Sequence, residues 1–223
     1  IIQKMIIRKA MEKRKTVITA TQMLHSMIRN PRPTRAEVSD IANAIYDGTD
    51  ALMLSGETAY GQYPLESVEM MTSIAQAVEE ELDSPRNLSP LILNNEVSFF
   101  LASSAVTAAT ALNAKAIIAD TKTGRTIRGL SAYRGRKPVY AQCYDKQTMR
   151  ELSLSYGVLA HYIEPLSAHD QFIKLAVENL CKRNMLNDQD RIVLLGGNFG
   201  ALYGASFIEV GQVDDMKHRI TNE

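Results

Sequence analysis

The pattern of apolar and polar residues predicts an alternation of helices and short strands along the whole chain. Over the first 82 residues, apolar side chains recur at intervals of three and four in 1–14, 36–48 and 65–82, which is the spacing of amphipathic helices. Two short apolar runs, TVITA at 16–20 and ALML at 51–54, lie between these helices. Each run is followed by a polar loop, so we expect two buried parallel strands.

Local signals indicate where these helices begin and end. Thr34 and Glu37 have the spacing of a capping box, in which the hydroxyl accepts from the third helical amide and the carboxylate reaches back. Gly48 suits the left-handed residue that ends a helix, and Pro64 suits the first turn of the next one.

The first predicted helix has an apolar face and a basic face. Ile2, Met5 and Ile6 belong to the apolar face, and Lys9 and Lys13 belong to the basic face. We expect the basic face to be solvated, and since no capping residue precedes the helix, we expect it to begin upstream of this sequence.

A linker is predicted at 83–95 (DSPRNLSPLILNN), which contains two prolines, two serines and three asparagines. We therefore divide the chain into 1–85, 86–211 and a tail at 212–223. The second part again alternates helices with apolar strands, so it is expected to form a mainly parallel sheet covered on both faces. The predicted helices lie at 97–112, 127–133, 146–156 and 168–184, and the predicted strands at 116–120, 139–143, 159–164, 191–197 and 205–210. The last two strands are too close in sequence for a crossover helix, so they should pair antiparallel.

Composition excludes several classes of protein. Lysine plus arginine equals aspartate plus glutamate at 25 each, which argues against a broad nucleic-acid or anionic-membrane surface. No apolar stretch is long enough to span a bilayer, and the amino terminus has no signal-peptide pattern. Cys143 and Cys181 lack metal-ligand spacing, so we expect two reduced, largely buried thiols in a cytoplasmic protein and no metal site.

Candidate chemistry lies at the carboxyl ends of the first two strands, where parallel α/β folds place their sites. Thr21 follows TVITA, and Ser55, Glu57 and Thr58 follow ALML. Hydroxyls there can bind a phosphate or carboxylate, or pass a proton through water, and Glu57 can hold a hydroxyl or a water in place. In the alternative interpretation, Thr21, Ser55 and Thr58 only cap the helices that follow.

A third strand end has the composition of an anion site. The loop after the strand at 116–120 opens into a helix, whose first amides point outward and favour an anion. It contains three hydroxyls, two cations and a glycine: Thr121, Lys122, Thr123, Gly124, Arg125 and Thr126. The alternative is an ordinary polar turn. The glycines of GGNFGALYG at 196–204 precede a strand rather than a helix, so they do not indicate a dinucleotide site.

These residues together resemble one family. The segment at 16–71, which includes ATQML, NPRPTRAE, DGTDA and MLSGETA, is similar to the seventh and eighth barrel strands of pyruvate kinase. The segment AKAIIADTKTGRTIRGLSAYRGRKP at 114–138 is similar to the first strand, effector loop and helix of that family's C-terminal domain. The resemblance runs from residue 1 to about residue 210 and implies a partial (β/α)8 barrel, namely its last two strands and helices, followed by a mainly parallel α/β domain.

The resemblance also implies a function. Pyruvate kinases transfer the phosphoryl group of phosphoenolpyruvate to ADP, use Mg²⁺ and K⁺, protonate the enolate of pyruvate, and act as homo-oligomers, tetramers when complete. By similarity, Thr21 contacts the substrate and belongs to the proton path, on which Ser55 and Glu57 order water. The loop from Thr121 to Thr126 then binds the phosphate of an activating effector.

The family's metal carboxylates, phosphoryl-binding lysine and lid domain have no counterpart in this sequence. We therefore expect the 223 residues alone to be inactive and to bind no metal cofactor. The alternative is a stand-alone α/β module that senses a phosphorylated metabolite. A lyase on a related phosphoenolpyruvate barrel is disfavoured because such enzymes lack the second α/β domain.

Overall fold

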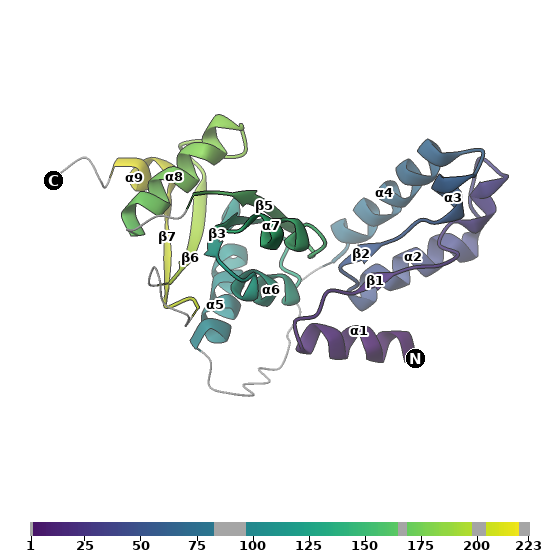
Figure 1. Ribbon diagram of the computed structural model, residues 1–223, viewed down its shortest axis with the longest axis horizontal. Coiled ribbons are helices and arrows are strands. Elements are labelled where there is room, and N and C mark those ends of the chain that lie inside the picture. Colours follow the sequence, from purple (N-terminus) through teal and green to yellow (C-terminus); the bar gives the residue numbers. More distant parts are fainter. Residues whose placement is uncertain (1, 83–96, 165–168, 198–203, 219–223) are drawn as a thin grey trace. The chain divides into compact units, whose positions relative to one another are not determined.

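The chain divides into two compact units, Ile1–Ser84 and Pro85–Glu223. A computed structural model describes residues 2–82, 97–164, 169–197 and 204–218 (Figure 1). The predicted linker at 83–95 lies outside the described residues. Within them, no helix is long and apolar enough to cross a membrane.

The first unit contains helices packed beside a two-stranded parallel sheet, β1–β2. Ile18 pairs with Ala51 and Thr19 with Leu52. Its core consists of methionine and aliphatic side chains from the loop after β1 and from α2 and α4: Met23, Leu24, Met27, Ile41, Ile45, Ile74 and Val78. The elements are α1 (Ile2–Glu12), β1 (Ile18–Thr19), the 3-10 helix η1 (His25–Ile28), α2 (Arg35–Asp47), β2 (Ala51–Leu52), α3 (Gly56–Ala59) and α4 (Pro64–Glu80).

Helix α2 begins and ends as predicted. Thr34 accepts a hydrogen bond from the Glu37 amide, and the Glu37 carboxylate accepts from the Thr34 amide, so the capping box is complete. Gly48 ends the helix with φ of 95°, in the left-handed region that favours glycine. Pro64 is the first residue of α4, where its missing N–H has no helical partner to lose.

Two expectations for this unit were wrong in detail. The strands are parallel but only two residues long and are not fully buried, since the Ile18 side chain is 45% exposed. In α1, Ile7 and Met11 are the buried residues, whereas Ile2, Met5 and Ile6 are exposed. Ile7 and Met11 are four residues apart and share one helix face, so the buried face is rotated from the predicted one.

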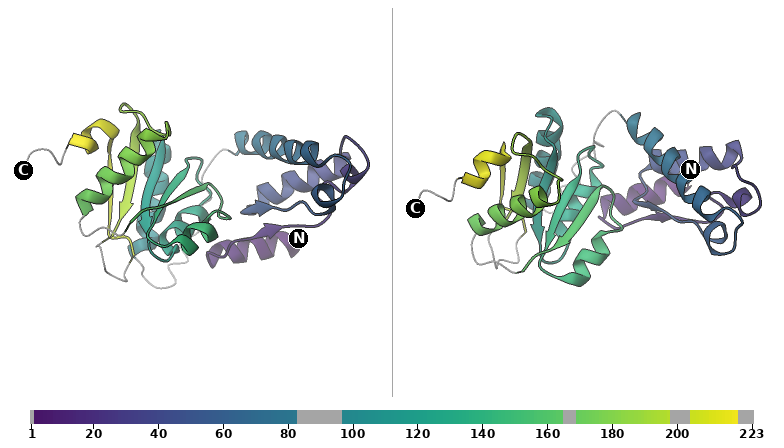
Figure 2. Two further views of the ribbon diagram at one scale, coloured as in Figure 1. Left: turned by 45° about the horizontal axis from the view of Figure 1, so that its top comes forward. Right: turned by 90° about the horizontal axis from the view of Figure 1, so that it is seen from above.

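The second unit is a five-stranded sheet in the order β5-β4-β3-β6-β7, parallel except for β7. Helices cover both faces, as predicted, and Figures 1 and 2 show α8 and α9 on the face opposite α5 and α6. The strands are β3 (Ala116–Thr121), β4 (Val139–Cys143), β5 (Val158–Tyr162), β6 (Arg191–Gly196) and β7 (Phe207–Gln212). The helices are α5 (Val97–Ala111), α6 (Arg125–Ala132), α7 (Lys146–Leu152), α8 (His169–Lys182) and α9 (Val213–His218).

Alternation along the strands divides the core of this unit into two layers. Ile117 and Ala119 face α5, α6 and α7, whereas Ala116 and Ile118 face α8 and α9. Because β3 lies in the middle of the sheet and packs on both faces, its first four residues, Ala116 to Ala119, are continuously apolar rather than alternating.

The predicted tail at 212–223 was wrong for its first residues. Gln212 is the last residue of β7, and Val213 and Met216 of α9 are buried at 0% and 2% exposure against α8. Val213 and Met216 are three positions apart, so they lie on one face of this short helix, and that face is buried. Residues 219–223 lie outside the described residues.

Both cysteines are free thiols, as expected. Cys143 is buried at the end of β4, and Cys181 in α8 is only partly buried. Burial, with a contribution from Asp145, raises the pKa of the Cys143 thiol to about 11, so this thiol is protonated near neutral pH.

Candidate functional site

The carboxylate of Glu57 joins the two strand-end loops of the first unit. Glu57 is 2% exposed, and its Oε1 accepts a hydrogen bond from the Leu24 amide at 3.1 Å. Its Oε2 accepts from the Ser55 amide at 2.8 Å. Leu24 follows β1 and Ser55 follows β2, so one buried side chain fixes the spacing between the two candidate strand ends.

The ionisation of Glu57 depends on these amides. Burial alone raises the pKa of a carboxyl, but hydrogen bonds from the Glu57, Ser55 and Leu24 amides, together with the charge of nearby His25, lower the pKa of Glu57 overall. The group is therefore a carboxylate at neutral pH. It accepts hydrogen bonds and does not hold a transferable proton.

Thr21 lies in a strained stretch of backbone. Thr21 and Gln22 have φ of 72° and 55°, in the left-handed region that β-branched residues rarely adopt. Both side chains are exposed. Two consecutive residues of this kind cost about 1–3 kcal/mol each and persist where the surrounding structure holds them, which is common in binding sites.

The hydroxyl groups at these strand ends do not act as helix caps. Ser55 precedes α3, but its side chain accepts no hydrogen bond from that helix. The residue that caps η1 after Thr21 is Leu24, again with no side-chain cap. Thr58 of α3 donates from Oγ1 to the carbonyl of Ser55, the residue before the helix, at 3.4 Å. Capping therefore does not explain Thr21 or Ser55.

A second carboxylate that the sequence identified only as a helix cap also shapes this region. Glu37 accepts hydrogen bonds from the Ser26 amide at 2.7 Å and the Ser26 hydroxyl at 2.6 Å, in addition to those from Thr34. Burial opposes ionisation of Glu37, but these four hydrogen bonds lower its pKa. The loop after β1 is thus held at Leu24 by Glu57 and at Ser26 by Glu37.

The loop after β3 has the geometry of an N-terminal anion site. Gly124 is the N-cap of α6, with φ of 79° and no side chain to occupy the first amides of the helix. Thr121 is buried, and its hydroxyl accepts from the Gly124 amide at 2.9 Å, so it shapes the loop from inside. Lys122, Thr123 and Arg125 are exposed. Only the exposed residues and the helix amides are therefore placed to contact a ligand, whereas the Thr121 hydroxyl is turned into the loop.

Residues outside the predicted set hold this loop in place. Arg128 donates from Nη1 to the Thr123 carbonyl at 2.9 Å and from Nη2 to the Glu151 carboxylate at 2.9 Å. Thr148 of α7 donates to the Lys122 carbonyl at 3.1 Å. No local sequence pattern indicates these three residues, because Thr148 and Glu151 come from α7, a separate helix.

The end of the glycine-rich segment after β6 approaches the same helix. A Cβ atom on Gly204 would lie 4.0 Å from Thr126 Oγ1 and would collide with Ser98 Oγ. Gly204 has φ of 75°, and Ser206 then begins the predicted antiparallel pairing by donating to the Gly196 carbonyl at 2.8 Å. Residues 198–203 of this segment lie outside the described residues.

Within the described parts of the chain, no three His, Cys, Asp or Glu side chains are gathered so that they could hold a metal ion. Glu57 and Glu37 both use their oxygens on backbone amides. The residues that the structure describes therefore do not fit a Mg²⁺ site.

Comparison with known proteins links both units to one family. The domain model "Pyruvate kinase, barrel domain" matches residues 1–68, and "Pyruvate kinase, alpha/beta domain" matches residues 100–210. The two matched segments fall within the two compact units, Ile1–Ser84 and Pro85–Glu223. The first unit is therefore part of a barrel, and the second is the family's α/β domain.

Individual relatives agree with this assignment. The chain is 42% identical over 203 residues to the pyruvate kinase of Borreliella burgdorferi, covering 89% of this chain and 43% of that protein. It is 45% identical over 199 residues to that of Clostridium acetobutylicum, covering 88% and 42%. With that of Bacillus licheniformis it shares 42% over 218 residues, covering 97% and 37%. The chain thus spans about two fifths of the length of the curated relatives it matches, and it belongs to the pyruvate kinase family.

Proposed function

We propose that this chain contributes the last two barrel strands and the C-terminal domain of a pyruvate kinase that transfers a phosphoryl group from phosphoenolpyruvate to ADP. What supports the proposal is that both domains of one family match in order along a single chain. Phosphoenolpyruvate and ADP are its substrates, and Mg²⁺ and K⁺ are the ions that the family uses. Because the described residues do not fit a Mg²⁺ site, we assign no step of the reaction to a metal held by this chain.

Within that reaction, Thr21 and Ser55 act at the carboxyl ends of β1 and β2. Their hydroxyls are exposed and are not used as caps, so they can bind substrate or pass a proton to the enolate through water. Glu57 is a positioning residue, since its carboxylate is engaged by the amides of both loops.

The direct test is a coupled assay of pyruvate formation from phosphoenolpyruvate and ADP. We expect the 223-residue chain alone to give no turnover, whereas family enzymes reach on the order of 1–100 per second. A chimera that joins the upstream part of the Bacillus licheniformis enzyme to this chain should be active. A folded chimera without activity, or an active chain alone, contradicts the assignment.

The role of Thr21 is tested in the same chimera. Thr21→Ala should lower kcat on the order of 100-fold, as for loss of a proton-transfer group, and Thr21→Ser should restore most of the rate. Thr72→Ala removes another exposed threonine hydroxyl, one bonded only to the Val68 carbonyl of its own helix, and should leave kcat unchanged. Equal rates for Thr21→Ala and Thr72→Ala would exclude Thr21 from the reaction.

We also propose that the loop from Lys122 to Thr126 binds the phosphate group of an effector. The support is the uncapped N-terminus of α6 beside the exposed Lys122 and Arg125. Calorimetric titration with a sugar phosphate should give weaker binding to Arg125→Ala than to the native chain. Equal binding would show that the loop is an ordinary turn. The alternative function, a phosphometabolite sensor without catalysis, requires the same loop but predicts an inactive chimera.

A further proposal is that the first unit is covered by another polypeptide segment, as in a homo-oligomer. The sheet β1–β2 has only two strands in the described part of the chain, and Ile18 and Met53 beside it are 45% and 43% exposed. Isolated two-stranded sheets are marginal in water. Light scattering at several concentrations should show association, whereas a monomer at every concentration would exclude it.

A further inference from the structure

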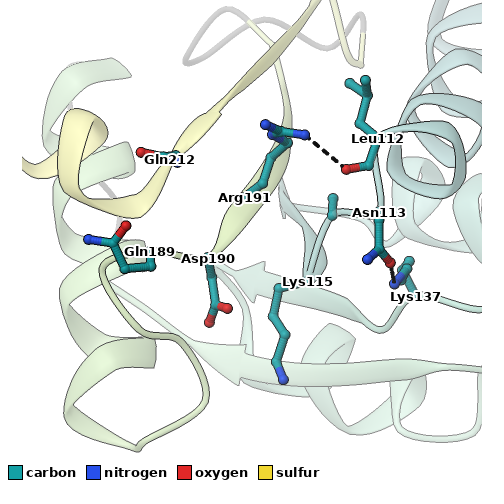
Figure 3. A pocket seen from close by; sticks show the side chains of 9 residues that line it. Leu112, Asn113, Lys115, Lys137, Gln189, Asp190, Arg191 and Gln212 are labelled. Carbon is teal, nitrogen blue, oxygen red and sulfur yellow. Dashed lines mark hydrogen bonds between the residues drawn. The ribbon is translucent and has the colours of Figure 1, made fainter.

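The second unit has a hollow at the end of its sheet where the parallel strands begin. The effector loop lies at the other end, after β3. The hollow has a volume of about 460 Å³ and is lined by the turn after α5, by residues just before β3 and β4, by the start of β6 with the two residues before it, and by the last residue of β7 (Figure 3). These are the amino ends of the parallel strands, whereas the effector loop follows the carboxyl end of β3. The volume lies within the range of small-molecule sites, about 300–1,000 Å³.

The charge of this hollow is predominantly positive. Lys115, Lys137 and Arg191 line it, against a single carboxylate, that of Asp190. Lys137 Nζ donates to Asn113 Oδ1 at 2.7 Å, and Arg191 Nη1 donates to the Leu112 carbonyl at 3.1 Å. Both acceptors are neutral. They therefore orient the cations without cancelling their charge.

The two other charged side chains in the lining are Lys115 and Asp190, and Asp190 balances only one of the three cations. In the described part of the chain, no ion pair or side-chain hydrogen bond engages Lys115, which extends from the rim of the hollow in Figure 3. The Asp190 carboxylate accepts from the Asn187 amide at 2.8 Å and is thereby held in a turn. Two cations thus exceed what Asp190 can balance.

Backbone hydrogen bonds join the strand ends that line the hollow. The Lys115 amide donates to the Arg191 carbonyl at 2.7 Å, and the Val213 amide donates to the Asp190 carbonyl at 3.0 Å. These bonds join the starts of β3 and β6 to the end of β7. A surface whose backbone is already hydrogen-bonded binds at a lower entropic cost than one that must become ordered on binding.

We propose that this hollow binds a small phosphorylated sugar. Lys115, Lys137 and Arg191 supply charge-assisted donors for the phosphate, for which a guanidinium is well suited. Asp190 and the carboxamides of Gln189 and Gln212 line the same hollow and can bond the hydroxyl groups of the sugar.

This site is distinct from the effector loop. Lys115 immediately precedes β3 and Thr121 is its last residue, so the length of the strand separates the two sites. Six residues at about 3.3 Å each give roughly 20 Å, which is longer than a sugar monophosphate. One such ligand cannot contact both.

Titration of the full ¹⁵N-labelled chain with glucose 6-phosphate tests the proposal by NMR. We expect saturable shifts of the amides of Asn113, Lys115 and Arg191, and no such shifts with glucose. Inorganic phosphate should bind the same site more weakly than glucose 6-phosphate. Phosphate binding as tight as that of the sugar phosphate would overturn the assignment of the sugar.

Variants identify the groups responsible. The double variant Lys115→Ala/Lys137→Ala should raise Kd by about tenfold or more, since each charge-assisted contact contributes on that order. Lys182→Ala, at an exposed lysine at the end of α8, and Arg125→Ala in the effector loop should leave the Kd for these amides unchanged. The proposal is overturned if the double variant binds like the native chain, or if no shift occurs at these amides up to about 10 mM, the weakest affinity of interest.

Discussion

Among the hydrogen bonds described for the first unit, Glu57 is the only side chain that bonds to both the loop after β1 and the loop after β2. Replacing Glu57 by alanine removes both bonds. The Leu24 and Ser55 amides then lose their acceptor in a region where Glu57 itself is 2% exposed. An unsatisfied buried donor costs about 1–3 kcal/mol. Leu24 is fully buried, whereas Ser55 is exposed and its amide can bond to water, so the loss is about 1–3 kcal/mol, partly offset because a buried charge is also removed. Domains are stable by only about 5–15 kcal/mol, so this change is large for the first unit.

The measurement must be local because the chain has two units. Hydrogen exchange followed residue by residue reports the first unit separately from the second. We expect faster exchange at Leu24, Ser55 and the core of the first unit in Glu57→Ala, and unchanged exchange in β3 and β6. Unaltered protection at Leu24 and Ser55 would refute the assignment of Glu57 as the link between the loops.

The pH dependence gives a second test of the same group. The pKa of Glu57 is lowered in the folded chain from its ordinary value of 4.5. A lowered folded pKa contributes stability that is fully present above the unfolded pKa and is lost as pH falls through the folded pKa. The first unit should therefore lose stability as the pH is lowered below about 4.5. Glu57→Gln keeps the shape but cannot ionise, so this variant should show a smaller loss over the same range.

Three further changes test other parts of the fold. Gly124→Ala should destabilise the second unit by about 1–2 kcal/mol because of the positive φ at this position. The loss should exceed that of Gly157→Ala, since the new Cβ at 124 would lie 2.7 Å from Arg128 Nη1 whereas a Cβ at 157 would meet no group. Equal losses in chemical denaturation would show that Arg128 moves freely. Met216→Ala should cost about 2–4 kcal/mol, since this side chain is 2% exposed in α9, and a loss near zero in the same experiment would mean that α9 is dispensable. At neutral pH, iodoacetamide should modify Cys181 well before Cys143, whose burial raises its pKa to about 11, and mass spectrometry that finds Cys143 modified first would contradict the burial.

The architecture of the second unit was predictable because its local and long-range signals agree. Apolar runs of the length of strands alternate with helical patterns, and the short gap between 191–197 and 205–210 excludes a crossover, so the β6–β7 pair had to be antiparallel. Where a signal is local, as at Thr34, Glu37 and Gly48, the predicted ends of α2 match the structure.

The errors arise where burial depends on partners distant in sequence. Both Ile2/Met5/Ile6 and Ile7/Met11 are apolar sets at helical spacing, so periodicity alone does not choose between them. In the tail, the six residues of α9 are too few to show a period, and only their contact with α8 reveals that Val213 and Met216 are core residues. The short η1 and α3 helices likewise gave no periodic signal.

The candidate site shows the same division between residue type and residue role. The sequence predicts that Glu57 holds a hydroxyl or a water in place. In the structure its carboxylate accepts hydrogen bonds from the amides of two loops. In the loop after β3, sequence alone does not distinguish the three threonine hydroxyls as ligand contacts. The structure separates them, since Thr121 is turned inward to the Gly124 amide whereas Thr123 is exposed. The backbone path of the loop therefore decides which hydroxyl can contact a ligand. That path depends on the left-handed conformation of Gly124 and on the hydrogen bond from Arg128 to the Thr123 carbonyl. No local sequence pattern predicts the contact with Arg128.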